Sequence, residues 1–219
     1  MNRSEIRNVS SFVGRYLWPM MKDQGYARRG LTFDKISAKS DHALVVIRSR
    51  RMDPGVVTFV VEAALAPKPF IAWLDRDQKV GTESLSEAHG LWRERLENWL
   101  PPAQIALGYG TEFWQFALAS ARSPDVPTES ECSHAVRAEL AKVLARLDSL
   151  LDRDVLVEQV LSGALTPLSI SGEDLAAAVI LADEPDRHAQ LEQLLERASQ
   201  SFDPPLELIA WIRGRASEA

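Results

Sequence analysis

The sequence predicts an α+β fold, in which an antiparallel sheet of three or four strands is backed by an N-terminal helix and followed by a helical C-terminal half. Two observations carry this prediction. Between residues 26 and 65, three runs rich in β-branched and aromatic residues are separated by short polar breaks. From residue 84 onward, apolar side chains instead recur at steps of three and four. The chain has 219 residues, which is long enough to bury a sizeable core.

An amphipathic helix is expected over residues 4–24. Its apolar side chains follow the spacing of a single helix face: Ile6, Val9, Phe12, Val13, Leu17, Met20 and Met21. Pro19 lies inside this pattern and predicts a kink or a restart of the helix. Gly25 follows the last apolar residue and is expected to end the helix.

The three strand-like runs cover residues 26–36, 43–52 and 56–65. The breaks at 37–41 and 53–55 are too short to hold a crossover helix, so neighbouring strands must be antiparallel. A fourth, weaker run is expected at 70–74.

Helices are expected through the rest of the chain. Ser84 and Glu87 have the spacing of a capping box, and so do Thr128 and Glu131. The expected helical segments are 84–100, 112–121, 128–150, 175–181, the stretch that starts at Pro185, and an apolar tail at 206–213. The proline-containing loop 123–127 is the best internal boundary, giving an α+β part at 1–122 and a helical part at 128–219 that pack as one compact body.

Composition excludes several classes of protein. The single cysteine excludes a disulfide scaffold and fits a reducing cytosol. No apolar stretch approaches the roughly 20 residues that a membrane span needs. The N-terminus resembles no signal peptide, so a cytoplasmic protein is expected.

Known catalytic and metal-binding motifs are missing from the sequence. Cys132 and His134 lack the spacing of a zinc site, so no metal is expected. Gly108 and Gly110 lie in a segment without the Lys-Ser/Thr ending of a phosphate-binding loop. No nucleophile elbow is present, and no cofactor is expected.

Charge is divided unevenly along the chain. Residues 1–51 hold 11 basic and 4 acidic side chains, whereas residues 111–219 hold 9 and 19. This asymmetry indicates either a charged binding surface or two complementary parts that face each other.

Arginines gather near two of the expected strands. Arg48, Arg50 and Arg51 end the second run, and Arg28 and Arg29 begin the first. Antiparallel pairing brings the two groups together, and strand alternation puts Arg48 and Arg50 on one face. Such a cluster can clamp a carboxylate or a phosphate. The alternative is an internal ion pair with the acidic helical half.

The segment from His89 to Arg95 is the second candidate site. On the helix expected there, His89, Trp92 and Arg93 share a face, and an aromatic ring beside cations makes a good contact surface. The alternative is a structural anchor, in which Trp92 is buried and Arg93 covers it.

These residues together resemble a bacterial family catalogued only as a domain of unknown function (number 4304). The resemblance rests on residues 25–33 after the first helix, a strand that ends in Arg48-Ser49, the apolar strand 58–61 and the segment 89–95. Family members usually carry Gln where this chain has Ile47 or Arg48. The resemblance implies a small soluble bacterial α+β protein of accessory or toxin-immunity type, and the family brings no established activity.

The expected function is non-catalytic binding of another protein, in an immunity or adaptor role, through the arginines and the His89 segment. The alternative is a small hydrolase or transferase that acts on an anionic small molecule, with His89 as its acid or base. Nucleic-acid binding is disfavoured because the pI is about 5.3.

Overall fold

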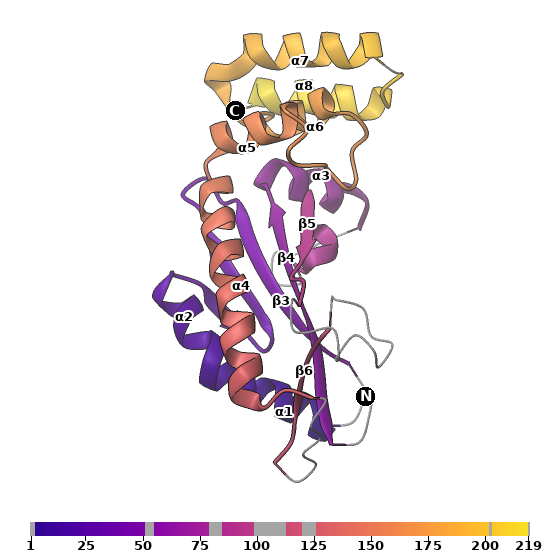
Figure 1. Cartoon of the computed structure of the whole chain (residues 1–219). Coiled ribbons are helices and arrows are strands. Elements are labelled where there is room, and N and C mark those ends of the chain that lie inside the picture. Colours follow the sequence, from indigo (N-terminus) through magenta and orange to yellow (C-terminus); the bar gives the residue numbers. More distant parts are fainter. Residues whose placement is uncertain are drawn as a thin grey trace. The chain divides into compact units, whose positions relative to one another are not determined.

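The computed structural model describes residues 3–50, 55–78, 85–98, 113–119, 126–201 and 203–218. It confirms the α+β class, with an antiparallel sheet, an N-terminal helix and a helical C-terminal half (Figure 1). The sheet has six strands, two more than the upper limit expected from the sequence.

The N-terminal helix is interrupted ahead of Pro19, as the sequence predicts. It consists of α1 (Arg3–Phe12), a π-helical segment η1 (Val13–Leu17) and α2 (Trp18–Asp23). The wider turn of η1 lets the Trp18 N–H bond to the Val13 carbonyl, and the helix resumes with Pro19 in its first turn. Gly25, at φ 85°, then ends α2 as expected.

The strands are β1 (Ala27–Arg29), β2 (Thr32–Ile36), β3 (His42–Arg50), β4 (Val56–Ala66), β5 (Trp92–Arg95) and β6 (Trp114–Ala117). The first five lie in the order β1-β2-β3-β4-β5, and β6 also pairs with β4. The run expected as one strand at 26–36 is a hairpin, because Gly30 adopts φ 63° and turns the chain between β1 and β2.

Three of the expected elements are wrong. Residues 70–74 lie in a helix, α3 (Lys68–Gln78), whose first turn accommodates Pro69. The helix expected at 84–100 is replaced by a short 3-10 turn, η3 (Glu87–His89), and then β5. In the range 112–121, the described residues form β6 rather than a helix. Both strands pair with β4, and their local sequence gives at most a weak signal of this.

The C-terminal helices follow the sequence pattern except for α5, which was not expected. They are α4 (Glu129–Leu150), α5 (Arg153–Leu161), α6 (Glu173–Ile180), the 3-10 turn η5 (Pro185–Arg187), α7 (His188–Ser201) and α8 (Leu206–Glu218). The predicted capping box begins α4, since the Thr128 hydroxyl accepts the Glu131 N–H and the Glu131 carboxylate accepts the Thr128 N–H.

The chain divides into two compact units that are interleaved in sequence. Unit 1 comprises residues 1–35, 44–63 and 94–146, and unit 2 comprises residues 36–43, 64–93 and 147–219. The boundary expected at 123–127 therefore falls, by sequence position, inside unit 1.

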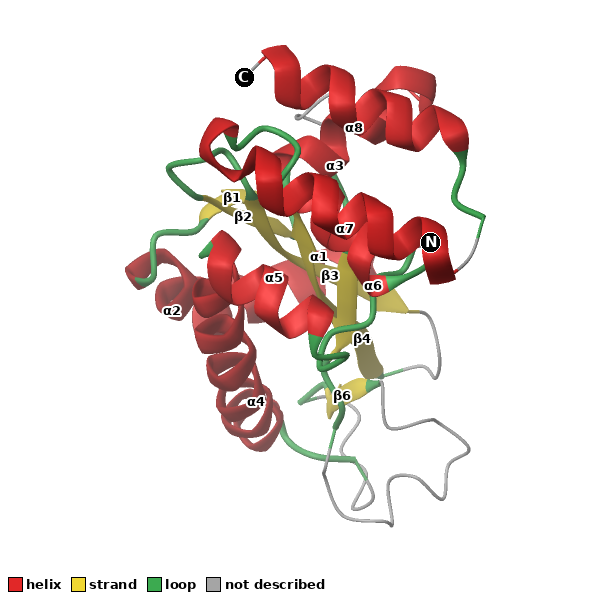
Figure 2. Cartoon of the chain, turned by 90° about the horizontal axis from the view of Figure 1, so that it is seen from above, coloured by secondary structure: helices red, strands yellow, loops and turns green. Residues whose placement is uncertain are grey.

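In unit 1, α1, η1 and α2 cover one face of the sheet. The Phe12 ring lies 5.2 Å from Phe59 of β4 and 4.8 Å from Phe116 of β6, measured between ring centroids. Trp18 approaches Phe33 of β2 in the same way, at 5.9 Å. The long helix α4 also runs beside the strands in both views (Figure 1, Figure 2).

The core of unit 2 forms around α6, whose residues from Leu175 to Ile180 are all buried. A helix that is apolar on every side needs neighbours on every side, and α6 contacts α3, α5 and α7. Within the described part of the chain, no helix combines the length and apolar character needed to cross a bilayer.

Candidate binding site: an arginine face on the sheet

The two faces of the sheet in unit 1 differ in chemistry. Phe59 points toward α1, and its cross-strand partner Trp114 shares that face. Side chains alternate along a strand, so Glu62, three positions after Phe59, points to the opposite face. Glu62 is the one charged residue within the eleven residues of β4, and its side chain is only 3% exposed.

Two arginines from neighbouring strands meet Glu62. The Arg95 Nε of β5 donates to Glu62 Oε1 at 2.7 Å, and the Arg48 Nε of β3 lies 3.4 Å from Glu62 Oε2. The arginine side chains are 47% and 43% exposed. The buried carboxylate therefore anchors two guanidinium groups that reach the surface.

Two further arginines belong to the same face. Arg50 is exposed and lies two residues beyond Arg48 on β3, so alternation keeps it on this side. Arg29 of β1 is exposed and pairs with Thr32, whereas Arg28 pairs with Phe33. We call Arg29, Arg48, Arg50 and Arg95, together with Glu62, the arginine face. Asp34 of β2 lies on this side of the sheet as well.

The predicted arginine cluster is only partly correct. Arg28 belongs to the helix-covered face, where it donates to the Gly30 carbonyl at 2.8 Å and to the Ser10 hydroxyl at 3.4 Å. The pairing that was expected to place Arg28 and Arg29 directly beside β3 is also wrong, because β2 lies between β1 and β3. Arg51 lies outside the described residues.

Ion pairs between the basic first half and the acidic helical half do form, and they include Arg15 with Glu129 and Arg76 with Glu207. Arg15 of η1 meets Glu129 of α4, with 3.0 Å between its Nη1 and the carboxylate. Arg48 pairs with Glu62 on the adjacent strand.

The helix face predicted for the second candidate site does not exist in the structure. His89, Trp92 and Arg93 do not share a helix face, because residues 92–95 form a strand and alternation separates the buried Trp92 from the exposed Arg93. His89 completes a capping box, in which its Nδ1 accepts the Ser86 N–H at 3.1 Å. This supports the structural alternative for Trp92 and gives His89 a local structural role.

Two residues of the arginine face were missed by reading the sequence. Glu62 has a detectable signal, since it is a lone acid inside an apolar strand and a buried charge needs partners. The sequence signal for Arg95 is weaker: the alternation in Trp92-Arg93-Glu94-Arg95 is typical of a strand.

The single cysteine is buried, and the possible metal ligands among the described residues are scattered. The Cys132 thiol is fully buried, and burial raises its pKa, so it stays protonated and unreactive at neutral pH. No three His, Cys, Asp or Glu residues within the described ranges group closely enough to hold a metal ion.

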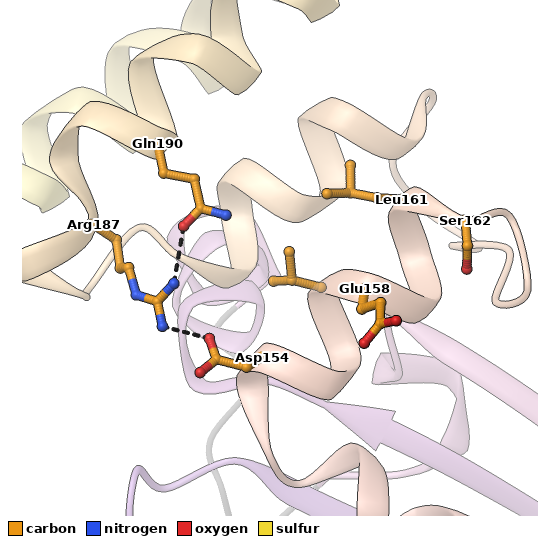
Figure 3. Close-up of a pocket in the computed structure, with 7 residues that line it drawn as sticks. Asp154, Glu158, Leu161, Ser162, Arg187 and Gln190 are labelled. Atoms are coloured by element: carbon orange, nitrogen blue, oxygen red, sulfur yellow. Dashed lines mark hydrogen bonds and ion pairs between the residues drawn. The ribbon is translucent and has the colours of Figure 1, made fainter.

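Two open cavities are lined by residues outside the arginine face. One, of about 440 Å³, is lined by Ser130, Glu131, His134 and Ala135 at the start of α4. The other, of about 540 Å³, lies between α5 and the start of α7, over Val157 and Leu161 (Figure 3). At its edge Arg187 donates to Asp154 at 2.6 Å and to Gln190 at 3.1 Å. No arginine of the arginine face lines either cavity.

Comparison with known proteins finds no matching family model, no matching curated protein and no matching solved structure. The resemblance to the family of unknown function stays a prediction.

Proposed function

We propose that this chain is a non-catalytic protein-binding module that engages an acidic surface of another protein through its arginine face. The observation that supports this most is the placement of four arginines, from β1, β3 and β5, on one face of the sheet. The accessory or toxin-immunity role that the family resemblance implies is one form that such binding takes.

Arginine suits this role because its planar guanidinium binds carboxylates through two parallel hydrogen bonds and is weakly hydrated. Arginine is also enriched in protein interfaces and among the residues that dominate their energy. The four arginines are spread over three strands of the sheet, an arrangement that suits the extended surface of a protein partner.

The alternative of a hydrolase or transferase gains no support from the site. The Nδ1 of His89, its one acid–base candidate, is engaged in a capping box. The thiol of Cys132 is buried and protonated.

Arg50→Glu is the sharpest test of the proposal. Arg50 is exposed at the end of β3, so reversing its charge changes the face with little expected effect on folding. Arg48→Glu is less suitable, because it places a second carboxylate beside the buried Glu62. The matched control is Arg137→Glu, which makes the same charge change at an exposed position of α4.

The experiment captures partners from cell lysate with the wild-type chain and both variants, then measures the affinity of the purified partner. We expect an acidic protein that binds at least about tenfold more weakly to Arg50→Glu and equally well to Arg137→Glu. Raising the salt concentration should weaken wild-type binding. Equal binding by all three chains would contradict the proposal.

A further inference from the structure

The arginine face contains one residue that acts through others. We infer that Glu62 is a positioning residue, which holds the Arg48 and Arg95 guanidinium groups in a fixed arrangement so that the face binds carboxylates by orientation rather than by diffuse charge. This inference rests on the proposed function and names the group that the face recognises.

The first support is the geometry around the carboxylate. Arg48 and Arg95 approach different oxygens of Glu62, each through its Nε. One carboxylate thereby sets the position of two side chains that start on strands at either side of β4. Long arginine side chains otherwise lose conformational entropy when they bind a ligand, and a fixed guanidinium reduces that loss.

The second support is the difference in burial. Glu62 is 3% exposed and the two arginines are nearly half exposed, so the acid itself offers almost no surface to a partner. A buried charge is expensive, and its place in the middle of β4 requires the two arginines as partners.

The third support is the effect of Glu62 on the net charge of the arginine face. Glu62 cancels one of the two positive charges, so as a source of attraction it weakens the face. If the face attracts carboxylates by net charge alone, Glu62 weakens binding. If binding depends on the orientation of the guanidinium groups, Glu62 strengthens it. The two possibilities predict effects of opposite sign when the negative charge is removed.

The test is Glu62→Gln, which keeps the size of the side chain and makes the chain more positive by one charge. The matched control is Glu94→Gln, which makes the same change on the opposite face, where Glu94 pairs with Arg146 at 2.8 Å. The probe is a fluorescent hexaglutamate peptide, with hexaglutamine as its neutral counterpart. Thermal melting checks that both variants fold.

We expect Glu62→Gln to bind hexaglutamate about tenfold more weakly than wild type, in spite of its added positive charge. Glu94→Gln should bind as tightly as wild type or slightly more tightly. The Arg95 Nε–H signal in NMR should be protected from exchange in the wild type and lose that protection in Glu62→Gln.

The outcomes separate the inference from the function on which it rests. Binding by Glu62→Gln that equals or exceeds that of Glu94→Gln overturns the positioning role, and the proposed function stands if Arg50→Glu still loses affinity. Equal binding of hexaglutamate by wild type and Arg50→Glu overturns the proposed function and the carboxylate preference together.

Discussion

Arg153 is the most deeply buried cation among the described residues, and it organises unit 2. Its guanidinium donates to Asp41 at 2.8 and 2.9 Å, to Glu184 at 2.7 Å and to Asp183. Burial lowers the pKa of Arg153, but the hydrogen bonds to Asp41 and Asp183 more than offset this, so the side chain stays charged. These bonds tie the first residue of α5 to the β2–β3 turn and to the segment after α6.

Replacing Arg153 with Met should lower the free energy of unfolding by about 3–5 kcal/mol, because the Asp41 carboxylate would remain buried without the opposite charge of Arg153. Urea denaturation measures this. The control is Arg187→Met, whose partner Asp154 is 68% exposed, and here we expect a loss below about 1 kcal/mol. Similar losses in the two variants would show that the Arg153 cluster does not stabilise unit 2 more than a surface pair does.

At the scale of elements, the entry into β5 depends on the glycine before it. A Cβ built at Gly90 would lie 2.7 Å from the Trp92 carbonyl oxygen and 2.8 Å from the Ala64 Cβ of β4. Only glycine lets the chain pass from η3 into a strand so close to β4. Gly90 therefore permits this segment to pack closely against β4, where the sequence predicted a helix at 84–100.

Gly90→Ala should therefore destabilise the protein by about 1–3 kcal/mol through overpacking. Gly214→Ala provides the opposite case, because a Cβ there meets nothing within 4 Å and the residue lies in α8. We expect that variant to gain up to about 1 kcal/mol from helix propensity. Thermal unfolding of both variants checks the signs, and a stabilised Gly90→Ala would contradict the role of the close approach.

At the scale of the whole molecule, each unit is assembled from three separate stretches of the chain. Unit 2 needs Asp41 to pair with Arg153 and α3 to contact α6, and both come from the first half of the sequence. We therefore expect that the helical half read from the sequence, residues 128–219, does not fold by itself.

An isolated fragment of residues 128–219 should consequently show reduced helicity and no cooperative melting transition by circular dichroism. The full chain, measured under the same conditions, should melt cooperatively. A fragment that melts as sharply as the full chain would show that its helices fold without the segments from the first half.

Elements with a strong local signal were predictable. The apolar spacing of α4 with its capping box, the alternation in β4 and the turn at Gly25 each depend on residues close in sequence. The placement of Arg48 and Arg50 on one face follows from the same local rule. The pairing of Glu62 with Arg95 could not be predicted in this way, because the two residues are 33 positions apart in the sequence.

Residues close together in the chain were enough to predict the α+β class, the uneven charge, the long helix α4 and the arginines near the strand ends. Contacts between distant segments set the rest: β5 and β6 are strands, Arg28 and Arg29 lie on opposite faces, and Glu62 joins Arg48 to Arg95. The reason is physical. Helix periods and caps are set by neighbours within a few residues, whereas strand recruitment and the pairing of a buried charge depend on which distant segment lies alongside.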